Sequence, residues 1–187
     1  HRGHDLYKKQ FSITDLSPES FNAVFLTPLP ENTLKSRAGK HNLTVENIEY
    51  NSDKTIPNLS EINKVQLEFT SPTRFYFKDS LVPAFESYLF WCSILSVWYN
   101  IKQRQPMLTA DKMLTLIYPE NISTTRSLVM LDKNLPFYGF TGKVDLIFDK
   151  KAIGDIKLFI YLLLEAASYI GVGTKTGWGM GNVKLII

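Results

Sequence analysis

The 187-residue chain has one cysteine, little excess charge and no long apolar run. Its single cysteine, Cys92, excludes an internal disulfide framework and a cysteine-based zinc site, and it suggests a reducing compartment. The apolar run 158–164 is flanked by Lys157 and Glu165, and it is far shorter than the roughly 18 residues that a membrane helix requires. The histidines and the scattered aspartates show no metal-ligand spacing. We therefore expect no membrane span, no metal and no cofactor.

The charges of the chain are close to balanced, with 21 lysines and arginines against 18 aspartates and glutamates. The net charge of +3 is only mildly basic, so charge alone does not identify a nucleic-acid-binding protein. A hydrophobic fraction of 44% is ample for a packed core, and the length allows one large domain or two small ones. Because the chain starts at His1 without a basic and then apolar leader, we expect a piece of a longer protein rather than a secreted one.

Half of the ten glycines lie within residues 171–181, between an apolar helical pattern at 158–170 and a strand-like tail at 183–187. Glycine allows positive φ and a close approach of the backbone. Successive N–H groups in such a loop form an anion-binding concavity, to which Lys175 adds a positive charge. A Walker loop or a dinucleotide fingerprint opens a helix, whereas here the helix precedes the glycines. The pattern therefore favours a phosphate-bearing partner of another kind.

From residue 64 onward the pattern predicts a strand, a helix, two strands, a helix and a strand. These elements lie at 64–70, from 79 or 80 to 102, at 124–131, 137–148, 156–170 and 183–187, with a short helix expected at 110–117. This is the order of a ferredoxin-like unit. Strands are also expected before a polar linker, at 10–16, 22–27 and 43–50. We therefore predict an α+β fold with two ferredoxin-like units, at residues 1–63 and 64–187, of which the first is incomplete at its N-terminus.

The second predicted unit also carries features that indicate packing rather than chemistry. The first long helix is expected to begin with Asp79 or Ser80 as its cap and with Pro83 in its first turn. Its aromatic and thiol side chains are expected in the core: Phe85, Trp91, Cys92 and Trp98. Gly139 and Gly142 predict a bulge or a bend in the strand that contains them.

Four segments together are typical of one family. They are the glycine-rich loop with the helix end before it (165–181), Phe69–Phe75 with its interrupting Ser-Pro-Thr, Tyr138–Gly142, and the N-terminal Lys9–Leu16. In this combination the chain resembles the CRISPR repeat-processing endoribonucleases of the RAMP superfamily, which have tandem ferredoxin-like (RAMP/RRM-like) units. That family places a strand and a helix upstream of a histidine that precedes the segment corresponding to Lys9–Leu16. We therefore expect either a longer natural protein, which includes the case of a fusion, or a disordered start.

The resemblance implies metal-independent cleavage of CRISPR precursor RNA within the repeat. RNA supplies its own nucleophile, the 2′-hydroxyl, and cleavage then needs a base, an acid for the leaving 5′-oxygen and cations around the phosphate. The implied products carry a 2′,3′-cyclic phosphate and a 5′-hydroxyl. The implied partner is CRISPR repeat RNA, as precursor and as mature crRNA, with other CRISPR-associated proteins or fused domains as further candidates. The implied location is the cytoplasm of a prokaryote.

A histidine near the N-terminus is the implied general acid or base, since the unperturbed pKa of histidine lies near 6.5. His4 is the first candidate and His1 the second, and the alternative is a solvated chain end. His41 lies in a polar, basic stretch and is expected to be a surface residue. Three neighbouring side chains could stabilise negative charge at the cleaved phosphate or simply be solvated: Tyr7, Lys8 and Lys9.

The glycine-rich loop is expected to cradle the RNA backbone. Its candidate contacts are Gly171, Gly173, Thr174, Lys175, Thr176, Gly177, Gly179 and Gly181. The alternative is a structural turn, in which the glycines let the loop pack on the preceding helix. Trp178 could stack on a base or fill the core. The other cations that could follow the RNA backbone, or else be solvated, are Lys35, Arg37, Lys40 and Arg74.

Two other functions stay open on the same fold. A RAMP subunit without nuclease activity would bind repeat RNA in EDTA and leave it intact. A ferredoxin-like module for protein interaction would bind no RNA at any salt concentration.

Overall fold

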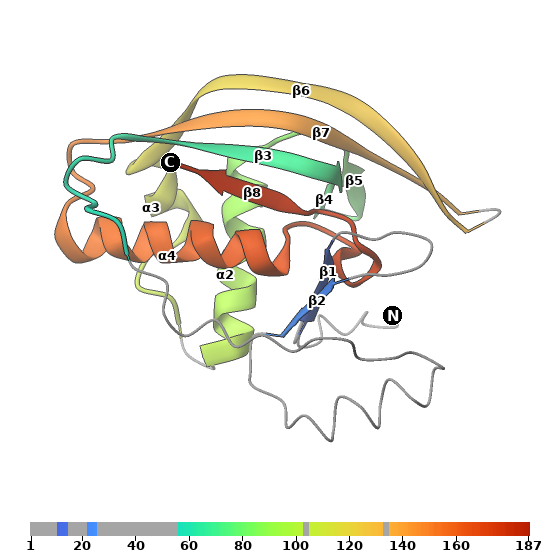
Figure 1. Cartoon of the computed structure of the whole chain (residues 1–187), viewed down its shortest axis with the longest axis horizontal. Coiled ribbons are helices and arrows are strands. Elements are labelled where there is room, and N and C mark those ends of the chain that lie inside the picture. The colour runs from blue at the N-terminus through green and yellow to red at the C-terminus, as the bar shows by residue number, and fades with distance from the viewer. Residues whose placement is uncertain (1–10, 15–21, 26–55, 103–104, 133–134) are drawn as a thin grey trace.

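The computed structural model describes residues 11–14, 22–25, 56–102, 105–132 and 135–187 (Figure 1). Its strands are β1 (Phe11–Thr14), β2 (Asn22–Phe25), β3 (Lys64–Thr73), β4 (Phe75–Phe77), β5 (Ser80–Val82), β6 (Ile117–Asp132), β7 (Leu135–Phe148) and β8 (Val183–Ile186). Its helices are α2 (Ser87–Lys102), α3 (Ala110–Leu114), α4 (Gly154–Ile170) and the 3-10 helix η1 (Thr176–Trp178). The strand predicted at 43–50 lies outside the described residues.

Four antiparallel strands form the main sheet, in the order β6-β7-β3-β8. In the register of the sheet, Leu67 of β3 lies between Val144 of β7 and Leu185 of β8. Along the chain the elements follow as β3, α2, β6, β7, α4 and β8. This is the predicted ferredoxin-like order, and it confirms the α+β fold class. The division at residues 63 and 64 stays a prediction, although β3 begins at Lys64.

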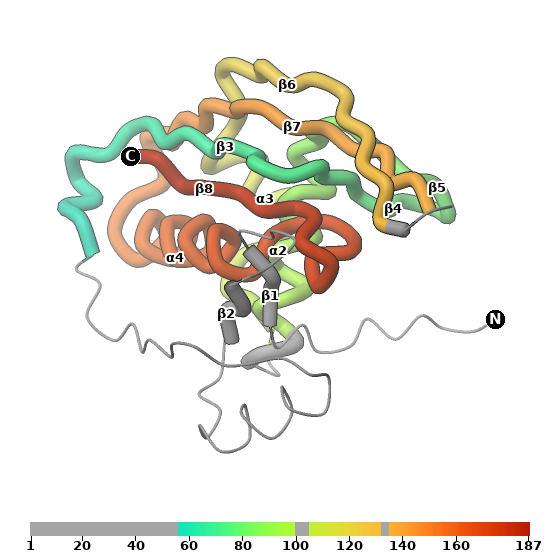
Figure 2. The backbone as a smooth tube through the Cα atoms, turned by 45° about the vertical axis from the view of Figure 1, so that its right-hand side comes forward, coloured from blue at the N-terminus to red at the C-terminus, as the bar shows by residue number. Residues whose placement is uncertain are grey.

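Both long helices cover the same face of the sheet and leave the other face open (Figures 1 and 2). The strand residues explain this, because Val65, Leu67 and Phe69 are buried whereas Gln66 and Glu68 between them are only half-buried. The helices contribute the rest of the core, including Trp91 and Ile94 of α2 and Ile160, Leu163 and Leu164 of α4. Of the side chains predicted in the core, Trp91 is buried, whereas Phe85, Cys92 and Trp98 are half-buried and pack against the core. No described helix combines the length and the apolar character needed to span a bilayer.

The open face of the sheet is held together by polar side chains around Asp145. Lys64 forms an ion pair with Asp145 at 2.8 Å. Gln66 donates a hydrogen bond to the same carboxylate at 2.7 Å, and Asn121 donates another at 3.1 Å. These donors, Lys64 first among them, lower the pKa of Asp145 to about 2. The network therefore ties together β3, β6 and β7.

The predicted start of the first long helix is wrong. Residues Ser80–Val82 form β5, which pairs with β4 as a hairpin, and α2 begins only at Ser87. The turn between the two strands has positive φ at Lys78 and Asp79, as two-residue hairpin turns require. The cap of the helix is Glu86, whose carboxylate accepts the backbone N–H of Leu89 at 2.8 Å.

The predicted interruption of the first strand takes the form of a bulge in β3. Phe69 lies opposite Gly142 and Thr73 lies opposite Phe140. The chain therefore advances four positions along β3 while it advances only two along β7. The predicted irregularity near Gly139 and Gly142 is thus present, but the extra residues belong to β3. We call residues 70–74 the bulge segment.

The described strands of the first predicted unit are β1 and β2, which form an antiparallel pair with Phe11 opposite Phe25. This pair lies beside the C-terminal end of α4, and β1 contacts η1 (Figure 1). The N-terminal part of the chain therefore reaches the glycine-rich loop.

Candidate functional site

The glycine-rich loop connects α4 to β8 and lies beside the bulge segment of β3. It has two parts with different surroundings. The loop base, residues 171–174 and 179–182, carries four of the positive-φ glycines, at 171, 173, 179 and 181. The loop corner, residues 175–178, contains Lys175 and the helix η1.

The loop base closes on itself and on the bulge segment through backbone atoms. Val172 donates a hydrogen bond to the carbonyl of Gly181 at 2.8 Å, and Gly181 donates to the carbonyl of Pro72 at 3.1 Å. Asn182 donates its backbone N–H to the Ser71 hydroxyl at 2.8 Å. A Cβ at Gly181 would collide with the carbonyl oxygen of Val172, so this position requires glycine.

A second set of contacts fixes the start of the loop. The N–H of Gly173 donates to the hydroxyl of Ser93 in α2 at 2.8 Å. The N–H of Thr174 donates to the carbonyl of Arg74 at 3.1 Å, and a Cβ at Gly173 would collide with that same carbonyl. The loop base is therefore fastened to β3 and α2, as well as to the end of α4. Its backbone donors are used within the protein.

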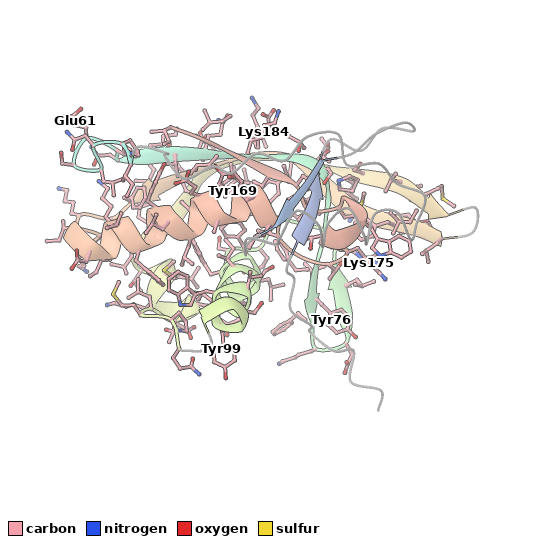
Figure 3. The ribbon with its side chains drawn as sticks, turned by 60° about the horizontal axis from the view of Figure 1, so that its bottom comes forward. Glu61, Tyr76, Tyr99, Tyr169, Lys175 and Lys184 are labelled. Atoms are coloured by element: carbon pink, nitrogen blue, oxygen red, sulfur yellow. The ribbon has the colours of Figure 1, made fainter. Side chains whose placement is uncertain are left out.

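The loop corner is exposed by contrast. Trp178 is 49% exposed, which excludes the alternative that it fills the core. The Lys175 Nζ atom lies 5.1 Å from the centre of the Trp178 ring, and Figure 3 shows Lys175 at the outer edge of the loop. The N–H groups of Lys175, Thr176 and Gly177 make no hydrogen bond to any described residue. A cation, an aromatic face and three backbone donors thus meet at one corner.

Thr176 anchors this corner from below. Its side chain is fully buried, and its Cγ2 methyl lies against the glycines at 171 and 181. A Cβ at Gly177 would meet nothing within 4 Å, so no packing contact requires glycine there. The corner is therefore held by Thr176 while Lys175, Gly177 and Trp178 face outward.

Arg74 connects the bulge segment to the loop and to β7. Its guanidinium carbon lies 4.0 Å from the centre of the Phe137 ring, and its Nε donates to the Thr174 hydroxyl at 3.3 Å. Removal from water lowers the pKa of Arg74 from its ordinary value. This arginine is half-buried, and it contacts protein groups on two sides.

The comparisons with known proteins agree with this architecture. The family model described as CRISPR-associated endoribonuclease Cas6 matches residues 67–183, which include β6, β7, most of β3, both long helices and the glycine-rich loop. The chain belongs to the Cas6 family. No curated protein matches its sequence.

Solved Cas6 structures share the fold. The chain aligns with the Cas6 (TTHB231) product complex over 98% of its own length and 84% of that chain, with a TM-score of 0.68 and 19% identity. The alignment with the Cas6 (TTHA0078) product complex covers 98% of this chain and 85% of that chain, with a TM-score of 0.67 and 19% identity. With Thermus thermophilus Cas6 (TTHB231) the alignment covers 66% of this chain and about half (53%) of that one, with a TM-score of 0.57 and 21% identity. At these identities the likeness establishes the fold.

Only part of the predicted set of site residues lies within the described residues. The glycines and threonines of the loop, Lys175 and Arg74 are brought together by the structure. The other predicted residues lie outside the described residues: His1, His4, Tyr7, Lys8, Lys9, Lys35, Arg37 and Lys40. Within the described ranges no three side chains of His, Cys, Asp or Glu gather closely enough to hold a metal ion.

Sequence reasoning missed two residues that hold the loop. Ser93 is a polar residue inside the apolar stretch of α2, and this contrast was a signal that it has a partner. Phe137 is fully buried beneath Arg74, and nothing in the sequence distinguishes it from the other phenylalanines of the core.

Proposed function

We propose that this Cas6 protein binds CRISPR precursor RNA and cleaves it within the repeat, without a metal, to leave a 2′,3′-cyclic phosphate and a 5′-hydroxyl. The observation that carries the proposal is the exposed loop corner within a chain that matches the family over residues 67–183. In this proposal the 2′-hydroxyl of the RNA attacks the adjacent phosphate, and its proton passes to a base while an acid protonates the leaving 5′-oxygen.

The loop corner supplies what a ribonucleotide backbone needs. The ammonium group of Lys175 neutralises one phosphate, and the three N–H groups that have no partner among the described residues can donate to its oxygens. The exposed face of Trp178 offers a stacking platform for one base, and stacking of this kind tolerates any sequence. The corner thus binds RNA, and it contains no group that can act as acid and base at neutral pH.

The acid–base chemistry is assigned to the N-terminal segment. His4 is the proposed general acid or base, with His1 as the second candidate, and Tyr7 and Lys8 stabilise charge on the phosphate. His4 lies seven positions before Phe11, where β1 begins, and β1 contacts η1. This connection supports an N-terminal catalytic segment that meets RNA held at the loop corner.

The test is cleavage of repeat RNA in EDTA under single-turnover conditions. We expect wild-type protein to cleave, His4→Ala to bind with nearly unchanged affinity but not to cleave, and His41→Ala, the matched control, to cleave normally. An RNA with a 2′-deoxy sugar at the cleaved position should be bound and left intact. Retained cleavage by His4→Ala would refute the catalytic assignment. Stable binding by wild-type protein with no cleavage would instead favour a non-catalytic RAMP subunit.

A further inference from the structure

Arg74 is bonded on two sides, although a surface arginine that binds RNA is usually free before binding. One face of its guanidinium covers Phe137 of β7, which has no exposed surface. Stacking of this planar group on an aromatic ring is favourable, and it becomes stronger when water is excluded. The side chain is therefore positioned by the protein in the absence of RNA.

Two hydrogen bonds join Arg74 to one residue of the loop, Thr174. Its Nε donates to the Thr174 hydroxyl at 3.3 Å, and its carbonyl accepts the Thr174 N–H at 3.1 Å. Thr174 directly precedes Lys175, the first residue of the loop corner. Any rotation of Thr174 therefore changes the direction of the Lys175 side chain and of the N–H groups at the corner.

We propose that Arg74 is a positioning residue: by stacking on Phe137 and holding Thr174, it fixes the loop corner against β7 in the orientation that RNA requires. The inference rests on the proposed function for the role of the corner. It assigns Arg74 a task different from the phosphate contact that its charge alone indicates.

The two roles differ in what a lysine can replace. A phosphate contact depends mainly on charge, so Arg74→Lys would keep most of it. A positioning role depends on the flat guanidinium and on Nε, which lysine lacks. Phe137→Leu removes the ring and leaves all charges unchanged, and Thr174→Val removes the acceptor with little change of shape. If Arg74 positions the corner, these three variants should behave alike.

The first measurement is amide hydrogen exchange in the RNA-free protein at Thr174 and at residues 178–181, whose backbone N–H groups are hydrogen-bonded. We expect Arg74→Lys, Phe137→Leu and Thr174→Val each to accelerate exchange there by roughly tenfold, since one stacking or hydrogen-bonding contact is lost. Arg126→Lys, on the exposed edge strand β6, is the matched control and should change nothing. Thermal melts identify any variant that fails to fold. If the buried Phe137 does not tolerate replacement by leucine, Thr174→Val still tests the inference, because Thr174 is only half-buried.

The second measurement is the affinity for repeat RNA as a function of salt concentration. Arg74→Lys should bind roughly tenfold more weakly although its charge is kept, and Arg74→Ala should leave the slope of log K against log salt unchanged. Lys175→Ala, a direct phosphate contact, should reduce that slope by roughly one. The double variant of Arg74→Lys and Phe137→Leu should bind RNA no more weakly than either single variant, because both substitutions break the same stacking contact.

The opposite results would overturn the inference. If Arg74→Lys exchanges and binds like wild-type protein while Arg74→Ala reduces the salt slope, Arg74 is a phosphate ligand. If wild-type protein binds no repeat RNA, the proposed function fails, and the exchange measurement still decides whether Arg74 orders the loop corner.

Discussion

The base and the corner of the glycine-rich loop are neighbours in the sequence but have opposite relations to the rest of the protein. In the base, backbone donors and tightly packed glycines are engaged by the bulge segment and by Ser93. In the corner, the N–H groups of residues 175–177 have no partner among the described residues, and Trp178 is half exposed. Most of the glycines therefore serve packing, and the RNA-facing surface that we propose is much smaller than the motif.

This difference matters for how such a motif is interpreted. A glycine-rich loop after a helix indicates a backbone that approaches something closely, but that partner can be the protein itself. Here the close partners are the carbonyls of Arg74, Pro72 and Val172. The rigid base then holds a short corner in a fixed direction, which is the preorganisation that binding needs.

The largest expected effect comes from breaking the base. Gly181→Ala places a methyl group against the Val172 carbonyl at a position with φ of 73°. We expect a loss of about 3 kcal/mol in the free energy of unfolding, because both a collision and backbone strain are introduced. Urea denaturation followed by circular dichroism measures this loss.

Gly177→Ala is the matched control for that substitution. No atom lies within 4 Å of a Cβ at Gly177, so the free energy of unfolding should change by less than about 0.5 kcal/mol. If Gly181→Ala were as stable as wild-type protein, the distinction between a packed base and an open corner would be lost.

A smaller effect, confined to binding, is expected from the corner. Trp178→Ala removes a half-exposed ring, so stability should change little, whereas the affinity for repeat RNA should fall roughly tenfold through lost stacking. Tyr76→Ala, which removes another exposed aromatic ring on the β4–β5 hairpin, is the matched control and should bind normally. Equal losses for both variants would indicate that any exposed aromatic ring affects binding, and the corner would lose its special role.

The order of helices and strands in residues 64–187 could be predicted because it depends on local patterns. The alternation of Val65, Leu67 and Phe69 with polar residues predicted β3, and the apolar run before Gly171 predicted α4. The β4–β5 hairpin could not be predicted in the same way. Its turn uses Lys78 and Asp79 at positive φ, where a glycine or an asparagine would have been the usual signal.

The site was predictable only in its location. The sequence places the glycines together, but their division into base and corner depends on residues about a hundred positions away, such as Pro72 and Arg74. Charge led to the expectation that Arg74 contacts RNA, yet its stacking on Phe137 arises only from the folded arrangement of β3 and β7. The N-terminal histidines lie outside the described residues, and their roles stay predictions.

The smallest expected effect comes from a third region, the polar network around Asp145 on the open face of the sheet. Like the loop base, this network is held by bonds within the protein. Asp145 has a pKa of about 2 in the folded protein, against roughly 3.9 for an unfolded aspartate. A lowered folded pKa means that the carboxylate stabilises the fold above about pH 4 and that this contribution is lost as the pH falls toward 2. Asp145→Asn should therefore melt below wild-type protein at pH 7, and the gap should close toward pH 2.

Melting temperatures of both proteins between pH 7 and pH 2 measure this gap. Glu68→Gln also removes one negative charge from the open face, where its carboxylate lies 3.8 Å from Lys143, and it is the matched control.

The Asp145→Asn substitution should leave the affinity for repeat RNA at pH 7 unchanged, because Asp145 bonds only Lys64, Gln66 and Asn121 among the described residues. A gap that stays constant with pH would mean that the ion pair with Lys64 contributes nothing to stability. A loss of RNA affinity would show that the open face takes part in binding, and the loop corner could then no longer account for RNA recognition alone.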